Sequence, residues 1–219
     1  MARQTSQGKC NLCGTTCGKA AMTRHLAKCV AEHAKAGAQR IFQIQIEGRG
    51  APEYWMHIEI PATASLKVLD SFLRKTWLEC CGHLSAFTIG GTTYDIAPEP
   101  DPWSDDKSKS MVVKLGDALA PGVKFGHEYD FGTTTELALK VVAERRGALK
   151  SATLLARNAP PLIPCAECGA PATQVCTQCI YEGPDAWLCD AHADAHACGE
   201  DYFLPVVNSP RVGMCGYTG

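Results

Sequence analysis

Residues 165–198 concentrate cysteine and histidine far beyond what a buried core requires. The stretch begins with CAECGAPATQVCTQC, where two CxxC motifs lie seven residues apart, and CDAHADAHAC follows. Thiolate and imidazole are the ligands that zinc prefers, and two tetrahedral ions require eight of them. The sequence therefore predicts two structural zinc ions, because protein ligands would fill every position around each ion. The eight ligands form four pairs: Cys165/Cys168, Cys176/Cys179, Cys189/His192 and His196/Cys198.

Two groupings of these four pairs are possible. The two residues inside a CxxC pair form a tight turn that aims both sulfur atoms at one ion. Because the loop between the first and second pairs is short, we favour cross-bracing, in which the first and third pairs hold one ion and the second and fourth pairs hold the other. Sequential pairing is the alternative.

A further candidate metal site lies near the N-terminus. Cys10 and Cys13 form another CxxC motif, and His25 and Cys29 follow after eleven residues. This is nearly the spacing of a ββα zinc finger, one residue short in the middle and with cysteine as the last ligand. Cys17 stands where such fingers place an aromatic core residue, so we interpret it as a packing residue, with an exchange for Cys29 as the alternative. We therefore expect three zinc ions in the chain.

The expected finger helix, MTRHLAKCVAEHAKAGAQR, is basic. Counting His25 as the seventh helical residue, the positions that contact bases in DNA-binding fingers are Gly18, Ala21 and Arg24. Only Arg24 can make a bidentate contact with guanine. Arg24, Lys19 and Lys28 could contact phosphates, which predicts salt-sensitive binding of nucleic acid. A solvated basic helix or a protein-binding finger is the alternative.

The formal net charge of -2 hides opposed ends. Residues 1–40 carry seven Lys or Arg against one acid, whereas residues 160–219 carry one Arg against seven acids. A basic head attracts polyanions and an acidic tail repels them. No apolar run approaches the roughly 20 residues that span a bilayer, and no N-terminal segment resembles a secretory signal. We therefore expect a cytoplasmic protein without a membrane partner, in which thiols stay reduced and clustered CxxC motifs bind metal.

The central segment, residues 41–158, predicts an α+β domain with a mostly antiparallel sheet and one main helix. Alternating apolar residues predict half-buried strands at 41–48 and 54–60, and helical spacing predicts a helix over 63–80. A hairpin is expected at 84–97 around Gly90-Gly91, followed by strands at 123–131 and 134–145. The stretch 97–110, which contains Trp103, predicts a surface loop, and RNAPPLIP predicts a linker. We thus expect three domains: 1–40, 41–158 and 159–219.

Two stretches of the central segment, PEYWMHIEIPATASLKVLDSFLRKTWLECCGHLSAFTIGGTTY and FGHEYDFGTTTELALKV, resemble the plasmid-Ri ORF-three-like family. That resemblance implies a compact α+β domain and an association with mobile elements, but no established activity. The family is sometimes labelled transposon-resolvase-like, yet no serine here lies in an arginine-rich motif such as a serine recombinase requires. The tail is similar to B-box-type cross-braced zinc modules in its ligand spacing, which implies that it binds proteins or helps to assemble them.

Two short segments could carry catalysis. Cys80, Cys81 and His83 lie close together in WLECCGHLSAF, and a thiolate–imidazole pair can be nucleophilic. Their apolar neighbours favour a buried helix end, so we interpret them as core residues. Glu128 and Asp130 share one face of an expected strand, which could support acid–base chemistry. We favour a solvated strand face as the explanation of that pattern, and the Asp130 side chain could simply fix a turn.

These observations predict a non-enzymatic zinc-binding adaptor that contacts nucleic acid through the finger and protein through the acidic tail. No catalytic residue is assigned. One alternative is an enzyme or mobile-element factor that uses Cys81, His83 or Asp130, and another is an assembly factor that docks on a ribonucleoprotein. Cys215 has no potential ligand near it in the sequence and is not counted among the metal ligands. The sequence leaves the oligomeric state open.

Overall fold

The computed structural model describes residues 6–98 and 108–219, so most of the predicted loop around Trp103 lies outside the described residues. The chain divides into two compact units. The first, here called the sheet unit, comprises the described residues of Met1–Lys75 and His83–Ala159. The second, the tail unit, comprises Thr76–Gly82 and Pro160–Gly219.

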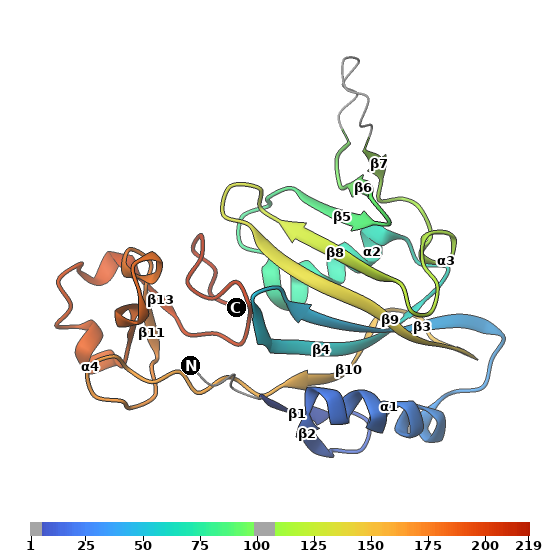
Figure 1. The fold of residues 1–219 in the computed structure, drawn as a ribbon, viewed down its shortest axis with the longest axis horizontal. Coiled ribbons are helices and arrows are strands. Elements are labelled where there is room, and N and C mark those ends of the chain that lie inside the picture. Colours follow the sequence, from blue (N-terminus) through green and yellow to red (C-terminus); the bar gives the residue numbers. More distant parts are fainter. Residues whose placement is uncertain (1–5, 99–107) are drawn as a thin grey trace. The chain divides into compact units, whose positions relative to one another are not determined.

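One large sheet forms the body of the sheet unit (Figure 1). Neighbouring strands are antiparallel, except for the parallel pair of β6 and β7. The sheet therefore confirms the predicted α+β class with a mostly antiparallel sheet. In the described part of the chain its ten strands have the order β2 (Thr16–Gly18), β1 (Gln7–Cys10), β10 (Thr153–Asn158), β4 (Ala51–Pro61), β3 (Gln39–Gly48), β9 (Thr135–Gly147), β8 (Lys124–Tyr129), β5 (Ser85–Ile89), β6 (Thr92–Asp95) and β7 (Lys109–Ser110).

Local sequence explains the elements of the central segment. Gly90 and Gly91 form the β5–β6 turn with φ of 56° and 81°, the left-handed conformation that the predicted hairpin requires. The predicted helix is shorter than expected, because α2 (Leu66–Leu73) passes into a π-helical turn, η1 (Arg74–Leu78). The Ser65 hydroxyl caps α2 by accepting a hydrogen bond from the backbone N–H of Val68. A one-turn helix, α3 (Leu115–Ala118), follows β7.

A buried polar network joins α2 to strands β5 and β8. The Asp70 carboxylate accepts hydrogen bonds from Ser85 Oγ at 2.7 Å, His127 Nε2 at 2.8 Å and Arg74 Nε at 2.8 Å. Burial alone would raise the pKa of Asp70, but the hydrogen bond from His127 and its other partners lower it overall. Burial lowers the pKa of His127, which favours a neutral ring that donates its Nε2–H to Asp70. Every member of this network therefore has a structural role in seating α2.

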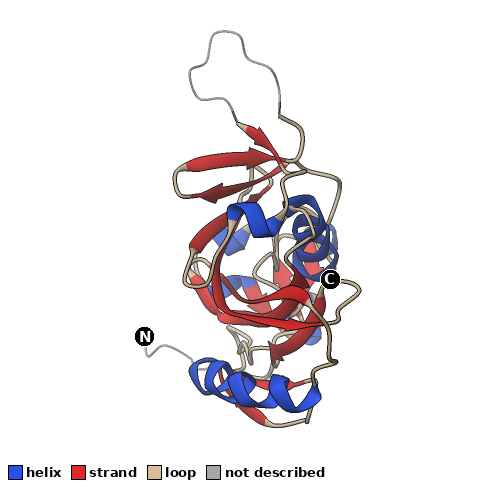
Figure 2. Cartoon of the chain, turned by 90° about the vertical axis from the view of Figure 1, so that its right-hand side faces the viewer, coloured by secondary structure: helices blue, strands red, loops and turns tan. Residues whose placement is uncertain are grey.

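Strand β4 is buried on both faces, which the alternating pattern did not predict. His57 and Glu59, on the face expected to meet solvent, are only 2% and 4% exposed. Helix α1 (Lys19–His33) runs along this side of the sheet (Figure 2), and its Thr23 hydroxyl lies 3.3 Å from His57 Nε2. Glu59 is paired with Arg145 of β9, with Arg145 Nε 2.6 Å from Glu59 Oε1. This face of β4 carries polar residues although it is buried. Its polar side chains contact helix α1 or form an ion pair with Arg145 instead of meeting water.

The N-terminal finger is part of the large sheet. Strand β1 pairs with β10, and β10 pairs with β4. The inner face of α1 packs on the same strands, since Met22 and Leu26 share one core cluster with Trp55 and Leu155. The predicted boundary at residue 40 therefore does not separate two compact units. Strand β10 joins the finger to the rest of the sheet. It overlaps the first two residues of RNAPPLIP, the stretch that predicted a linker.

The tail unit contains a second, smaller sheet. Its strand order is β12 (Trp187–Leu188), β11 (Gln174–Cys176) and β13 (Phe203–Pro205). The remaining turns are helical: η2 (Cys179–Tyr181), η3 (Pro184–Ala186), α4 (Asp190–Ala193) and η4 (Glu200–Tyr202). Residues 76–82 also belong to this unit, because Trp77 is fully buried and its carbonyl accepts a 2.6 Å hydrogen bond from Ser209 Oγ. The sequence pattern predicts that residues 76–80 continue the central helix, which the structure does not show.

Across residues 6–98 and 108–219, no helix combines the length and the apolar character that crossing a bilayer demands.

The seating of the finger on the sheet predicts a specific sensitivity at Gly8 of β1. A Cβ atom there would lie 2.3 Å from the Arg157 carbonyl and 2.5 Å from the Trp55 ring, so Gly8→Ala must push β1 away from its neighbours. We expect it to lower the free energy of unfolding by about 1–3 kcal/mol. Gly126→Ala in β8 is the matched control, since its nearest heavy atom would be 4.0 Å away. Urea unfolding followed by circular dichroism measures both, and equal stability of the two variants would contradict this packing.

Candidate metal centres

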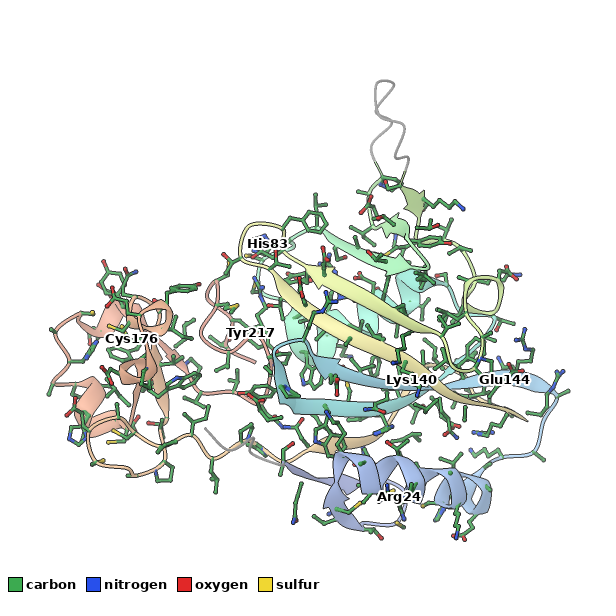
Figure 3. The ribbon with its side chains drawn as sticks, viewed as in Figure 1. Arg24, His83, Lys140, Glu144, Cys176 and Tyr217 are labelled. Atoms are coloured by element: carbon green, nitrogen blue, oxygen red, sulfur yellow. The ribbon has the colours of Figure 1, made fainter. Side chains whose placement is uncertain are left out.

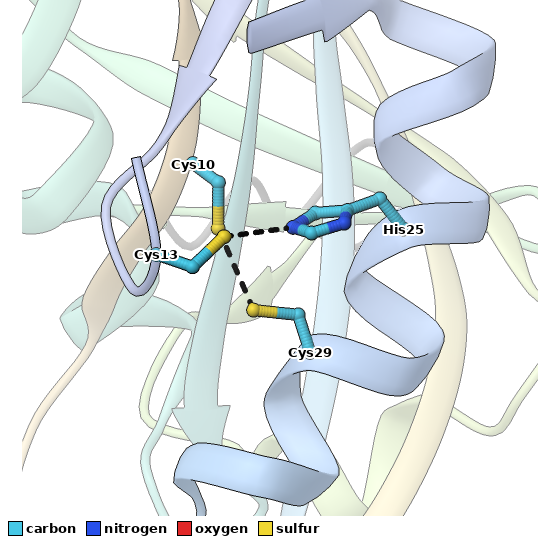
Figure 4. A group of neighbouring side chains, drawn as sticks. All are labelled: Cys10, Cys13, His25 and Cys29. Carbon is cyan, nitrogen blue, oxygen red and sulfur yellow. Dashed lines mark hydrogen bonds between the residues drawn. The ribbon is translucent and has the colours of Figure 1, made fainter. Parts of the chain in front are cut away.

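Strand β1, the turn after it and helix α1 bring the four predicted finger ligands together (Figure 4). Cys10 ends β1 and Cys13 lies in the following turn, while His25 and Cys29 are one helical turn apart on α1. Their four ligand atoms lie within 4.8 Å of one another. Cys13 Sγ is 3.2 Å from His25 Nε2, and Cys10 Sγ is 3.9 Å from Cys29 Sγ. His25 is the seventh residue of α1, the register that the finger spacing predicted.

The tail unit brings its eight predicted ligands together in two clusters. Cys168 Sγ lies 3.8 Å from Cys189 Sγ in one cluster, and Cys179 Sγ lies 3.7 Å from Cys198 Sγ in the other. The first pair therefore meets the third and the second meets the fourth, which is the cross-braced arrangement and not the sequential one. The clusters are Cys165, Cys168, Cys189 and His192, and Cys176, Cys179, His196 and Cys198.

The separations between ligand atoms fit a metal ion at the centre of each cluster. Zinc lies about 2.3 Å from sulfur and about 2.0–2.1 Å from nitrogen, so a tetrahedral site places two sulfur atoms about 3.8 Å apart and sulfur and nitrogen about 3.6 Å apart. The sulfur–sulfur distances given above are 3.7 to 3.9 Å. His196 Nε2 lies 3.4 Å from Cys179 Sγ, and His192 Nδ1 lies 3.1 Å from Cys189 Sγ and 3.7 Å from Cys165 Sγ. These three clusters can each hold one metal ion.

The thiols of the clusters differ strongly in acidity. Hydrogen bonding to Thr15 lowers the pKa of Cys13 to about 6, whereas burial raises the pKa of Cys29 to about 12. Burial also acts to raise the pKa of Cys165, but backbone hydrogen bonds from Cys189 and Cys168 outweigh it and lower the pKa to about 6. Ionisation of a second thiol so close to a first thiolate is disfavoured, because the two negative charges repel each other. A divalent cation removes that repulsion, so metal binding would release protons from the remaining thiols.

Cys17 lies outside the finger cluster. It is partly buried and packs against the core formed by α1, β4 and β10. This is the packing position that the finger spacing predicted, and the exchange of Cys17 with Cys29 is not found.

The three residues predicted to contact nucleic acid have different environments. Arg24, labelled in Figure 3, and Lys28 are exposed on the outer face of α1. Lys19 is half-buried at the start of the helix, where its ammonium group pairs with the Glu47 carboxylate and lies 3.4 Å from the Pro52 carbonyl. The helix therefore offers Arg24 and Lys28 to a partner, while Lys19 is engaged within the sheet unit.

The predicted catalytic candidates do not form an activated nucleophile. Hydrogen bonds with Cys80 and Cys215 raise the pKa of Cys81 to about 12, so its thiol is protonated at neutral pH. His83 is half-buried, with Nε2 3.5 Å from Asp130 Oδ2. Asp130 follows β8 with a positive φ of 65°, and its Oδ1 accepts hydrogen bonds from the backbone N–H groups of residues 132 and 133. Asp130 is thus a turn residue, and no shared strand face with Glu128 forms.

The interpretation of Cys80 and Cys81 as core residues is wrong for Cys81, which is exposed, while Cys80 is half-buried. Both cysteines belong to the tail unit, where Cys81 Sγ lies 3.6 Å from Cys215 Sγ. Sequence spacing could not reveal this neighbourhood, since 134 positions separate the two residues. The CysCys dipeptide, and a Cys215 that belongs to no CxxC motif, were the signals in the sequence.

The cross-braced grouping predicts metal contents that sequential pairing does not. Cys165→Ser with Cys189→Ser disrupts one site and should lose one ion per chain, whereas Cys165→Ser with Cys176→Ser disrupts two sites and should lose two. Elemental analysis of the purified full chain by mass spectrometry measures this, with Cys17→Ser as the control that loses none. Loss of two ions from the first double variant and of one ion from the second would contradict the cross-braced grouping.

Comparisons with known proteins bear on the central segment. No curated protein matches the chain. The crystal structure of a protein of unknown function from Methanosarcina mazei Go1 is similar over 55% of this chain and 70% of that chain, with 16% identity and a TM-score of 0.45. The family model described as plasmid pRiA4b ORF-3-like protein matches residues 40–173, which is more than half of the chain. The chain therefore belongs to the plasmid pRiA4b ORF-3-like protein family.

Proposed function

We propose that this protein is a non-enzymatic zinc-binding adaptor that contacts nucleic acid through helix α1 and protein through the tail unit. The observation that carries the proposal is the set of three clusters, each with three cysteines and one histidine held at tetrahedral separations. Protein ligands would fill all four positions around each ion. Such sites stabilise a fold and leave no position for a substrate or a reactive water.

Zinc is the metal that best suits these clusters. Three thiolates and one imidazole form a soft, nitrogen-containing set, and zinc accepts tetrahedral geometry without a preference imposed by d-electrons. The tail unit also needs such support, because a body of about 70 residues rarely has a sufficient hydrophobic core of its own. Metal ions would supply the missing folding free energy.

The outer face of α1 supports a contact with a polyanion. Arg24 and Lys28 lie one helical turn apart, and the exposed residues beside them, Ala20, Ala27 and Ala31, are small. The opposite face of α1 is fixed to the sheet by its buried apolar residues. A rigid helix that exposes two cations among small alanines suits close approach to a phosphate backbone, although the exposed Glu32 lies one turn from Lys28. Arg24 alone could read a base, so we infer contact dominated by phosphates.

The surface of the tail unit supports a protein partner instead. Residues 160–219 have seven acidic residues and one Arg, which disfavours a nucleic acid. Large apolar side chains are nevertheless exposed there: Leu162 is 78% exposed and Tyr181 is 68% exposed. Exposed aromatic and aliphatic groups on an acidic surface are typical of protein-binding sites.

Substitution on α1 tests the nucleic-acid contact. Arg24→Ala with Lys28→Ala should weaken binding of a mixed-sequence 20-base-pair duplex and of single-stranded RNA, measured by fluorescence anisotropy. If each side chain neutralises one phosphate, the slope of log K against log salt on the duplex should fall by about 1.8. Lys67→Ala with Lys75→Ala is the charge-matched control, since both lysines are exposed elsewhere on the sheet unit and the change removes the same two charges.

Two results would sink this part of the proposal. One is an absence of binding to either probe by the zinc-loaded chain at low salt. The other is an equal loss of affinity in the two double variants, which would show that net charge acts without a contact at α1.

A further inference from the structure

We infer that the tail unit contains a fourth metal site, formed by the thiolates of Cys80, Cys81 and Cys215. This site is independent of the adaptor function. Cys81 Sγ lies 3.6 Å from Cys80 Sγ and 3.6 Å from Cys215 Sγ, close to the sulfur–sulfur separations of the other three clusters. All three sulfur atoms lie within 4.8 Å of one another.

The pattern of cysteine use supports a metal site at these residues. All thirteen cysteines lie within the described residues, and none forms a disulfide. Nine belong to the three clusters described above, and three of the remaining four meet at this site. Cys17, which packs in the core of the sheet unit, is the exception.

A buried arginine supplies independent support. Arg211 is fully buried, and its Nη2 atom donates a hydrogen bond to Cys80 Sγ at 3.3 Å. Negative charge beside a buried guanidinium favours its burial. Three thiolates around a divalent cation carry a net charge of minus one, which would stabilise the guanidinium of Arg211.

Backbone conformation marks the same residues. Among the described non-glycine residues, only Asp130 and Cys215 have a positive φ, 65° for Asp130 and 47° for Cys215. A left-handed conformation costs free energy for a cysteine, and such strain is concentrated at functional sites. The sulfur of Cys215 is the one that lies 3.6 Å from Cys81 Sγ.

The donor set selects the ion. Thiolates favour zinc or another soft divalent metal over calcium or magnesium, which prefer oxygen ligands. Held by three protein thiolates, the ion would have a structural role. It would connect residues 80 and 81, which lie within the family match at 40–173, to Cys215, which lies outside that match.

Metal content of the full chain tests this site. The zinc-loaded protein, purified with reductant, should contain four zinc ions per chain, and Cys81→Ser with Cys215→Ser should contain three. Cys17→Ser is the matched control and should keep four. Cys215→Ser alone should also contain three ions, whereas Cys215→His, which keeps a metal ligand at this position, should contain four, and this separates loss of a ligand from loss of folding. After replacement by Co²⁺, the thiolate-to-metal absorption should fall by about one quarter in the double variant.

Two results would overturn the fourth site. One is an equal zinc content in the wild-type chain and the double variant. The other is rapid alkylation of Cys81 in the zinc-loaded chain, which would favour the nucleophile predicted as an alternative. Neither result touches the finger or the other tail clusters, whose ions are removed by substitutions at Cys10 or Cys165 instead.

Discussion

Repulsion between thiolates placed side by side is the constraint on which this chain depends. Each cluster gathers three sulfur atoms and one imidazole within 4.8 Å. Without a cation the thiols of a cluster do not all ionise readily, since the pKa of Cys13 is lowered to about 6 whereas that of Cys29 is raised to about 12. A divalent ion converts these mutually repelling groups into a fixed junction between strand, turn and helix. The fold of both ends of the chain follows from that junction.

The finger shows how such a junction is used in this protein. Its β1–β2 hairpin and α1 add a strand pair and a covering helix to the sheet of the sheet unit. The helix buries Trp55 and covers His57. The stability of this side of the sheet therefore depends on the finger, and the stability of the finger depends on its metal ligands. The exposed cations of α1 consequently stand on a rigid support, which is what an adaptor surface requires. The tail unit has less apolar core and relies more heavily on its clusters.

Much of this could be predicted from the sequence, where the signal is local. Ligand spacing predicted the finger register at His25 and the cross-braced grouping, because short loops restrict which thiols can meet. Alternation and the Gly90-Gly91 turn predicted most strands of the central sheet. Long-range partners were not predictable. The pairing of β1 with β10, the burial of Glu59 by Arg145 and the meeting of Cys81 with Cys215 all join distant positions, and no spacing rule reports such contacts.

Hydrogen exchange before and after complete chelation tests the central claim most directly. The account predicts that residues 160–219 lose their slow exchange when metal is removed, together with β1, β2 and α1. Strands β3, β8 and β9 should retain protection, since their core of buried apolar residues contains no metal ligand. Unchanged protection of the tail unit in the metal-free chain would contradict the claim that bound cations hold it together.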